Sequence, residues 1–216
     1  MKLLGLLFAS FVFATISRAE VPSILLKYSW VFDSWCAAQT GVEIKQIERE
    51  RLAAKFLDLQ AAWNKTGPAL LAQTEKTIGK PFYEKEMIAT VFLCKKTPSM
   101  SMPLLINGNW FVSDAPMPTD IVADIIYHEL MHTYLVDHFP NLPSSPLLTK
   151  YGNEDPGVLS HLHLMALQKT VYLELGLKER IAKVIEFDSE HYKGAYKRSW
   201  EIVIQEGADK FVAELK

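Results

Sequence analysis

The chain has 216 residues, of which 49% are hydrophobic and 22% carry a charge, and its formal net charge is −2. This length and hydrophobic content suffice for a globular domain with a substantial core. A slightly acidic chain without a basic surplus is not typical of proteins that bind nucleic acid, so we expect no nucleic-acid partner.

The N-terminal segment is typical of a secretory signal peptide. A short basic start is followed by an apolar stretch at residues 3–16 and by Ser17-Arg18-Ala19, a small-x-small cleavage site. The stretch of 14 residues is shorter than the ~20 residues that cross a bilayer. We predict cleavage after Ala19 and export to the periplasm or the exterior, with an uncleaved anchor as the alternative. Cleavage of residues 1–19 would leave one domain, residues 20–216, with a formal charge of −4 and no stable membrane span.

The sequence contains two cysteines, Cys36 and Cys94. In an exported protein they could form one disulfide, which would stabilise the fold by about 4 kcal/mol on a loop-closure argument. Two buried free thiols are the alternative. Because no Cys-x-x-Cys is present, neither a redox motif nor a cysteine zinc site is indicated.

The next part of the chain is predicted to form two helices. Residues 42–63 have a charged face and an apolar face, with apolar residues at helical spacing at positions 52, 56, 59 and 63. Gly67-Pro68 predicts a break in the helix, and a second helix is expected at about residues 68–78.

A small sheet is predicted after these helices. Residues 87–94 are apolar and rich in β-branched side chains, which is typical of a strand. Asn107-Gly108 lies between two short apolar runs, residues 103–106 and 109–112, and this pattern predicts a hairpin. The expected fold is therefore α+β and mostly helical, with a small antiparallel sheet preceding the next helix.

That next helix contains the most informative pattern of the chain. Residues 128–132 read His-Glu-Leu-Met-His, an H-E-x-x-H pattern, inside a predicted helix of about 19 residues that ends before Pro140. On a helix, His128 and His132 face the same side and can bind one zinc ion, while Glu129 can deprotonate the metal-bound water. All six histidines lie between residues 128 and 191, as expected if several of them gather at one metal. The pattern predicts metal-assisted hydrolysis, foremost of peptide bonds.

A small sheet followed by an H-E-x-x-H helix resembles the N-terminal half of the zincin metallopeptidases, over residues 86–139. The resemblance implies that His128 and His132 are zinc ligands and that Glu129 is the general base. It also implies that an edge strand of the sheet binds a peptide substrate in extended form.

Two histidines do not complete a catalytic zinc site, which needs three protein ligands. His138 has the spacing of the longer metzincin motif, but Leu135 stands where that motif has a glycine for its sharp turn. With the helix continuing, His138 would be carried away from the zinc.

A second helical segment, residues 156–176, offers further candidates and resembles the gluzincin layout, in which the third ligand comes from a downstream helix. His161 and His163 lie roughly 160° apart on the helical wheel, so only one of them can face the metal from within the helix. We expect one of this pair to be the ligand and the other to support it or to line the substrate pocket. The carboxylate alternatives are Glu154 and Glu174.

The C-terminal region is expected to supply groups that stabilise the transition state. His191 and Tyr192 are the catalytic candidates for binding the oxyanion, with Tyr151 and Tyr196 as further possibilities. A last helix at about residues 189–205 is expected to close the core.

Two functions are consistent with these patterns. The first is an exported zinc-dependent hydrolase, a metallopeptidase acting on a peptide or protein substrate. The alternative is a non-catalytic exported protein of zincin fold that uses the metal structurally or binds a peptide or protein. Glu129 favours the enzyme, because a purely structural site would not need it, and a fourth protein ligand would favour the alternative.

Overall fold

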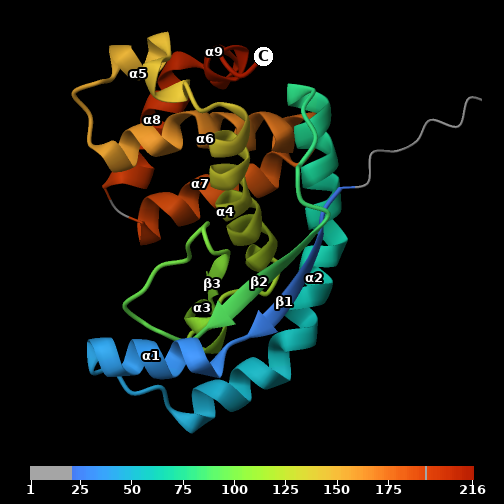
Figure 1. Cartoon of the computed structure of the whole chain (residues 1–216), viewed down its shortest axis with the longest axis vertical. Helices are drawn as coiled ribbons and strands as arrows, with labels where there is room; N and C mark the ends of the chain where they lie inside the picture. The colour runs from blue at the N-terminus through green and yellow to red at the C-terminus, as the bar shows by residue number, and fades with distance from the viewer. Residues whose placement is uncertain (1–20, 193) are drawn as a thin grey trace, which may run out of the picture.

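The computed structural model describes residues 21–192 and 194–216 (Figure 1). The expected signal peptide at residues 1–19 lies outside the described residues. Within the described part of the chain, no helix has the length and apolar character needed to cross a membrane.

The described chain is mostly helical, with one small sheet. The strands are β1 (Ser23–Tyr28), β2 (Glu86–Phe92) and β3 (Leu105–Asn107). The helices are α1 (Trp30–Thr40), α2 (Gln46–Ile78), α3 (Asn109–Val112), α4 (Ile121–His138), the 3₁₀ helix η1 (Leu142–Ser144), α5 (Pro146–Lys150), α6 (Pro156–Glu174), α7 (Lys178–His191), α8 (Ala195–Glu206) and α9 (Ala208–Ala213). The prediction of a mostly helical chain with a small sheet before the H-E-x-x-H helix is confirmed.

The sheet is parallel, so the predicted antiparallel sheet is wrong. Its strand order is β1-β2-β3, and both pairs of neighbouring strands run in the same direction. The predicted hairpin does not form because Gly108 has helical backbone angles, φ −76° and ψ −10°. The Asn107 side chain accepts a hydrogen bond from the N–H of Asn109, the first residue of the short helix α3, at 2.9 Å. Asn107-Gly108 therefore starts a helix at the end of a strand.

Contacts from neighbouring segments occupy both edges of the sheet. At the β1 edge, the side chain of Gln60 on α2 accepts a hydrogen bond from the Leu26 N–H at 2.8 Å. At the β3 edge, Met100 and Leu105 exchange backbone hydrogen bonds of 2.8 and 2.9 Å in an antiparallel bridge.

Helix α2 is continuous across Gly67-Pro68, so the predicted break is wrong. Pro68 is exposed, and a missing N–H on the solvent side of a long helix is tolerated when packing on the other side holds the helix together. A Cβ atom on Gly67 would lie 2.5 Å from the Trp63 ring, so this glycine makes room for a buried indole. The helix ends at Gly79, which has the left-handed φ of 79°.

The predicted C-terminal helix at residues 189–205 is divided in the structure. Gly194, with φ 88°, separates α7 from α8, and α9 follows. Trp200 and Val203 of α8 are buried in the main hydrophobic core, so the expected role of this segment in closing the core is confirmed.

Helices α4 and α6 agree closely with the segments predicted from helical spacing. Helix α4 packs against both α2 and α6, and Figure 1 shows it passing through the middle of the molecule. The Tyr127 hydroxyl on α4 lies 2.7 Å from the Thr74 hydroxyl on α2, and both residues are buried. This packing fixes the helix that carries the H-E-x-x-H pattern.

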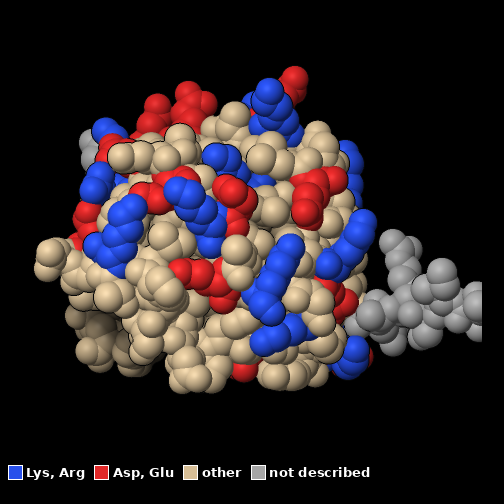
Figure 2. All heavy atoms as spheres, turned by 90° about the horizontal axis from the view of Figure 1, so that it is seen from above, with Lys and Arg blue, Asp and Glu red and all other residues tan. Residues whose placement is uncertain are grey.

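A disulfide joins Cys36 on α1 to Cys94 just after β2, with the two Cα atoms 6.0 Å apart. Of the two possibilities for these cysteines, the structure therefore has the disulfide. The bond and the neighbouring Phe92 and Leu105 form a second, small apolar cluster. On the face shown in Figure 2, basic and acidic side chains are interspersed.

Candidate metal centre

Three histidines from two helices converge at the centre of the structure. His128 and His132 on α4 and His161 on α6 each offer one ring nitrogen, and these nitrogens lie within 4.8 Å of one another. The His161 ring centroid is 5.2 Å from that of His128 and 4.8 Å from that of His132. Three imidazoles are a common donor set for a catalytic zinc ion.

The orientation of His161 fits a metal ligand. Its Nδ1 lies 2.6 Å from the Gly157 carbonyl oxygen, so the Nδ1–H donates to the backbone and Nε2 keeps its lone pair. That Nε2 is buried and has no hydrogen-bond partner among the described residues. A buried nitrogen of this kind needs a partner, and a metal-binding histidine commonly donates its other ring N–H to a carbonyl. The residues present therefore fit a zinc ion.

Electrostatics keep the three rings neutral, which is the form that binds metals. Burial, together with the neighbouring His132 and His161, lowers the pKa of His128 well below its ordinary value. Burial and the nearby His161 lower the pKa of His132 to about 3. The pKa of His161 is also lowered, mainly by burial.

Glu129 lies beside the histidines and is buried as well. Burial raises the pKa of its carboxyl to about 7, although a hydrogen bond from Ser101 opposes this shift. The Ser101 hydroxyl donates to Glu129 Oε2 at 2.7 Å. Ser101 was not identified from the sequence, because it lies in an irregular segment where no periodic pattern marks it.

Tyr196 on α8 is the aromatic residue in closest contact with the cluster. Its hydroxyl oxygen lies 3.3 Å from His128 Nε2, and its ring centroid lies 4.3 Å from that of His161. Burial raises the pKa of Tyr196 above its ordinary value, so the hydroxyl keeps its proton. Tyr196 was one of several tyrosines considered from the sequence, and its position shows that it is the one beside the histidines.

Of the two catalytic candidates in this region, Tyr192 lines the cavity beside Glu129, and its ring stacks on Tyr196 with centroids 4.7 Å apart. His191 does not lie at the cluster, which corrects the sequence interpretation. Its exposed ring stacks on Phe187, and its Nδ1 lies 3.0 Å from the Phe187 carbonyl oxygen. The end of α7 directs this side chain toward Phe187 and away from the three histidines.

His163, the other candidate of the pair for the third ligand, lies away from the cluster, which corrects that alternative. It occupies the opposite side of α6, where its Nε2 is 2.7 Å from Glu214 Oε2. The remaining candidates for the third ligand are likewise bound elsewhere: His138 to the Pro81 carbonyl, Glu154 to Arg198, and Glu174 to Thr77 and Gln73.

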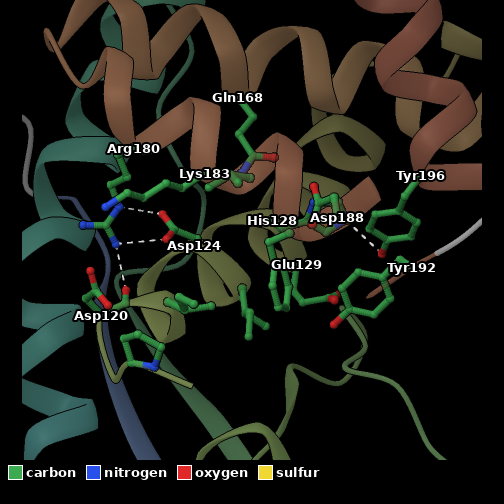
Figure 3. A pocket seen from close by; sticks show the side chains of 15 residues that line it. Asp120, Asp124, His128, Glu129, Gln168, Arg180, Lys183, Asp188, Tyr192 and Tyr196 are labelled. Carbon is green, nitrogen blue, oxygen red and sulfur yellow. Dashed lines mark hydrogen bonds and ion pairs between the residues drawn. The ribbon is translucent and has the colours of Figure 1, made fainter. Parts of the chain in front are cut away.

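Two cavities flank the histidine cluster. One, of about 190 Å³, is lined by His128, Glu129 and Tyr196 together with residues of α7 (Figure 3). The other, of about 750 Å³, begins at His132 and runs between α4, the segment around η1 and the start of α6. The cluster therefore lies between two recesses.

Comparisons with protein-family models, with curated proteins and with solved structures find no match to this chain. The chemistry of the site therefore has to be argued from its own residues.

Proposed function

We propose that this protein is a zinc-dependent hydrolase and acts as a metallopeptidase with a zincin-like site. The observation that carries the proposal is the convergence of His161 from α6 with His128 and His132 from α4, with Glu129 beside them. When bound there, a zinc ion would supply Lewis acidity to polarise a carbonyl group and make water more acidic.

The protein's own groups account for the proton transfers. Glu129 would take a proton from water and then deliver it to the leaving amine, and a general base with a pKa near neutrality is suited to both steps. The Tyr196 hydroxyl would donate a hydrogen bond to the oxygen that becomes negative when the carbonyl is attacked. Its contact of 3.3 Å with His128 supports this role.

The two cavities favour a substrate that extends on both sides of the reacting bond. One recess is beside His128 and the other beside His132, so a chain crossing the cluster could place side chains in both. A peptide or protein substrate has this form.

The alternative function is a structural metal site in a non-catalytic protein. Structural zinc sites usually have four protein ligands, whereas catalytic sites have three and an open position. Among the described residues, the candidate group contains three histidines. This count, together with Glu129, favours the enzyme. The parallel sheet departs from the antiparallel sheet that we expected, so the proposal rests on the site.

We also propose that the protein is exported. The Cys36–Cys94 disulfide supports this location, because disulfides persist mainly in oxidising compartments. The segment that would direct export, residues 1–19, lies outside the described residues.

The decisive experiment compares the native protein with Glu129→Gln. Zinc content is measured by metal analysis, and turnover is measured with a fluorogenic peptide library. We expect both proteins to bind zinc at one ion per chain, and we expect turnover to fall by roughly three orders of magnitude or more in the variant, as when a general base is lost from a cooperative site. Glu190→Gln, an exposed change of the same chemistry on α7, is the control. Unchanged turnover in Glu129→Gln would contradict the mechanism.

A further inference from the structure

The cavity beside Glu129 has apolar walls close to the reacting centre. Ile121 and Ile125 of α4 form one side, and Val184, Phe187 and Tyr192 form another. Figure 3 shows this recess between the His128–Tyr196 contact and the Arg180–Asp124 pair. Its volume of about 190 Å³ has room for an aromatic side chain.

Two buried polar side chains line this recess, and one of them has unused hydrogen-bonding capacity. Gln168 of α6 is 1% exposed and lies beside His128, yet neither atom of its amide group has a hydrogen bond of normal geometry among the described residues. Asp188 of α7 is 6% exposed, and its Oδ2 accepts from the Trp200 indole N–H at 2.9 Å. An unpaired amide at this depth favours a ligand that pairs with it.

The basic residues of the recess do not satisfy these groups. The Arg180 guanidinium is engaged by the Asp124 carboxylate at 2.8 Å and by the Asp120 carbonyl at 2.7 Å. Lys183 is exposed at the mouth of the recess. A purely hydrocarbon ligand would leave the Gln168 amide unpaired, and an alkylammonium group would lose its hydration against the apolar walls.

We propose that this recess is a specificity pocket for an aromatic side chain with a hydroxyl tip, a tyrosine of the substrate next to the bond that is cleaved. The ring would pack against Phe187, Tyr192 and the aliphatic walls, and the hydroxyl would donate to Asp188 or accept from the Gln168 amide. This assignment rests on the proposed function, because it places the pocket beside the residue that acts as the general base.

The test uses small fragments that need neither zinc nor turnover. Binding of p-cresol, toluene and butylammonium to the purified protein is measured by NMR titration. We expect p-cresol to bind about tenfold more tightly than toluene, the size of one good hydrogen bond to a buried polar group, and butylammonium to bind most weakly. Equal binding of p-cresol and toluene, or a preference for butylammonium, would overturn the proposal.

Two variants test which residue forms the hydrogen bond with the p-cresol hydroxyl. Asp188→Asn keeps an acceptor for Trp200 and should reduce the preference for p-cresol over toluene at least threefold, while Glu190→Gln should leave that preference unchanged. Gln168→Leu should reduce it as well. Gln168→Leu could instead lower zinc affinity and leave the preference for p-cresol over toluene unchanged. In that case Gln168 only orients His128, and its assignment to the pocket is wrong.

Hydrolysis then separates the two proposals. If the fragment preference is absent while peptides are cleaved in a Glu129-dependent manner, the pocket assignment fails and the hydrolase stands. If p-cresol binds as expected while no peptide is cleaved, the metallopeptidase fails and the pocket remains a phenol site. If both hold, peptides with tyrosine next to the cleaved bond should have a higher kcat/KM than their phenylalanine counterparts.

Discussion

Nε2 of His163 lies 2.7 Å from Oε2 of Glu214, and this contact holds the imidazole on the side of α6 that faces the C-terminal helix. His161, two residues earlier, faces the other histidines. Two neighbouring histidines on one helix therefore have different tasks, one at the candidate metal site and one in the packing of the C-terminus.

This division predicts opposite results for two alanine variants. His161→Ala should lose zinc affinity by at least about a hundredfold, since a direct ligand is removed and the loss of a mere supporting partner already costs roughly 10- to 100-fold. His163→Ala should bind zinc normally but unfold at lower denaturant, because Glu214 loses its partner. Competition with a chromophoric chelator and urea unfolding measure the two effects. Loss of zinc in His163→Ala alone would contradict the assignment.

The Tyr196 hydroxyl gives a second prediction. Tyr196→Phe removes the donor and keeps the ring that packs on His161, so kcat should fall by about 10²-fold with little change in KM, as for other oxyanion donors. Zinc content should stay the same. Steady-state kinetics and metal analysis check this, with Tyr192→Phe as the matched variant. A larger fall in kcat for Tyr192→Phe would assign the donor to that residue.

Asp188 predicts a pH-dependent stability. Burial raises the pKa of its carboxyl to about 7 in the folded state, whereas an unfolded aspartate titrates at about 3.9. Below pH 4 both states are protonated. Between about pH 4 and pH 7 the unfolded state releases its proton and the folded state retains it, so the folded state loses stability as pH rises, by up to about 4 kcal/mol.

Asp188→Asn removes this titration. Its free energy of unfolding, relative to the native protein, should therefore increase between pH 4 and pH 8. Urea unfolding at three pH values measures the difference, with Glu190→Gln as the control. A difference that is constant across this range would show that Asp188 is ionised in the folded state.

A larger residue at position 67 should destabilise the protein, because it would overpack the contact with the Trp63 ring inside α2. In Gly67→Ala, the new methyl group would meet the buried Trp63 ring at 2.5 Å. Overpacking costs about 1–3 kcal/mol, which exceeds the ~1 kcal/mol that alanine gains over glycine in a helix. We expect lower stability by urea unfolding, and a smaller loss when Trp63→Phe is already present. A gain in stability would show that the ring can move aside.

The sequence predicts the elements whose patterns are local. Helices α4 and α6 follow from apolar spacing together with end signals, and the pair His128 and His132 follows from helical geometry. The direction of the strands does not follow in this way, because β1 pairs with β2 more than 50 residues further along the chain. The single long helix α2 was missed because Pro68 and Gly67 are helix breakers by local rules, and only the packed Trp63 ring shows why they are accepted.

The candidate site likewise has features that follow from local spacing and features that depend on contacts between distant parts of the chain. Because His161 and His163 point to opposite sides of one helix, only one of them can face His128 and His132. Which of the two does so depends on the contact between His163 and Glu214, which lies far along the chain. Ser101 and Tyr196 reach Glu129 and His128 through tertiary contacts alone. His191 looked suitable by residue type, and the end of α7 directs it toward Phe187.

The contacts at the two edges of the sheet restrict how anything could add to it. Gln60 occupies backbone positions of β1, and Met100 occupies those of β3. A further strand, whether from a substrate or from a second copy of the chain, would have to displace these groups before it could pair. A peptide bound at the histidines would then be selected mainly by what its side chains find in the two recesses, and sequence preference should exceed preference for an extended backbone.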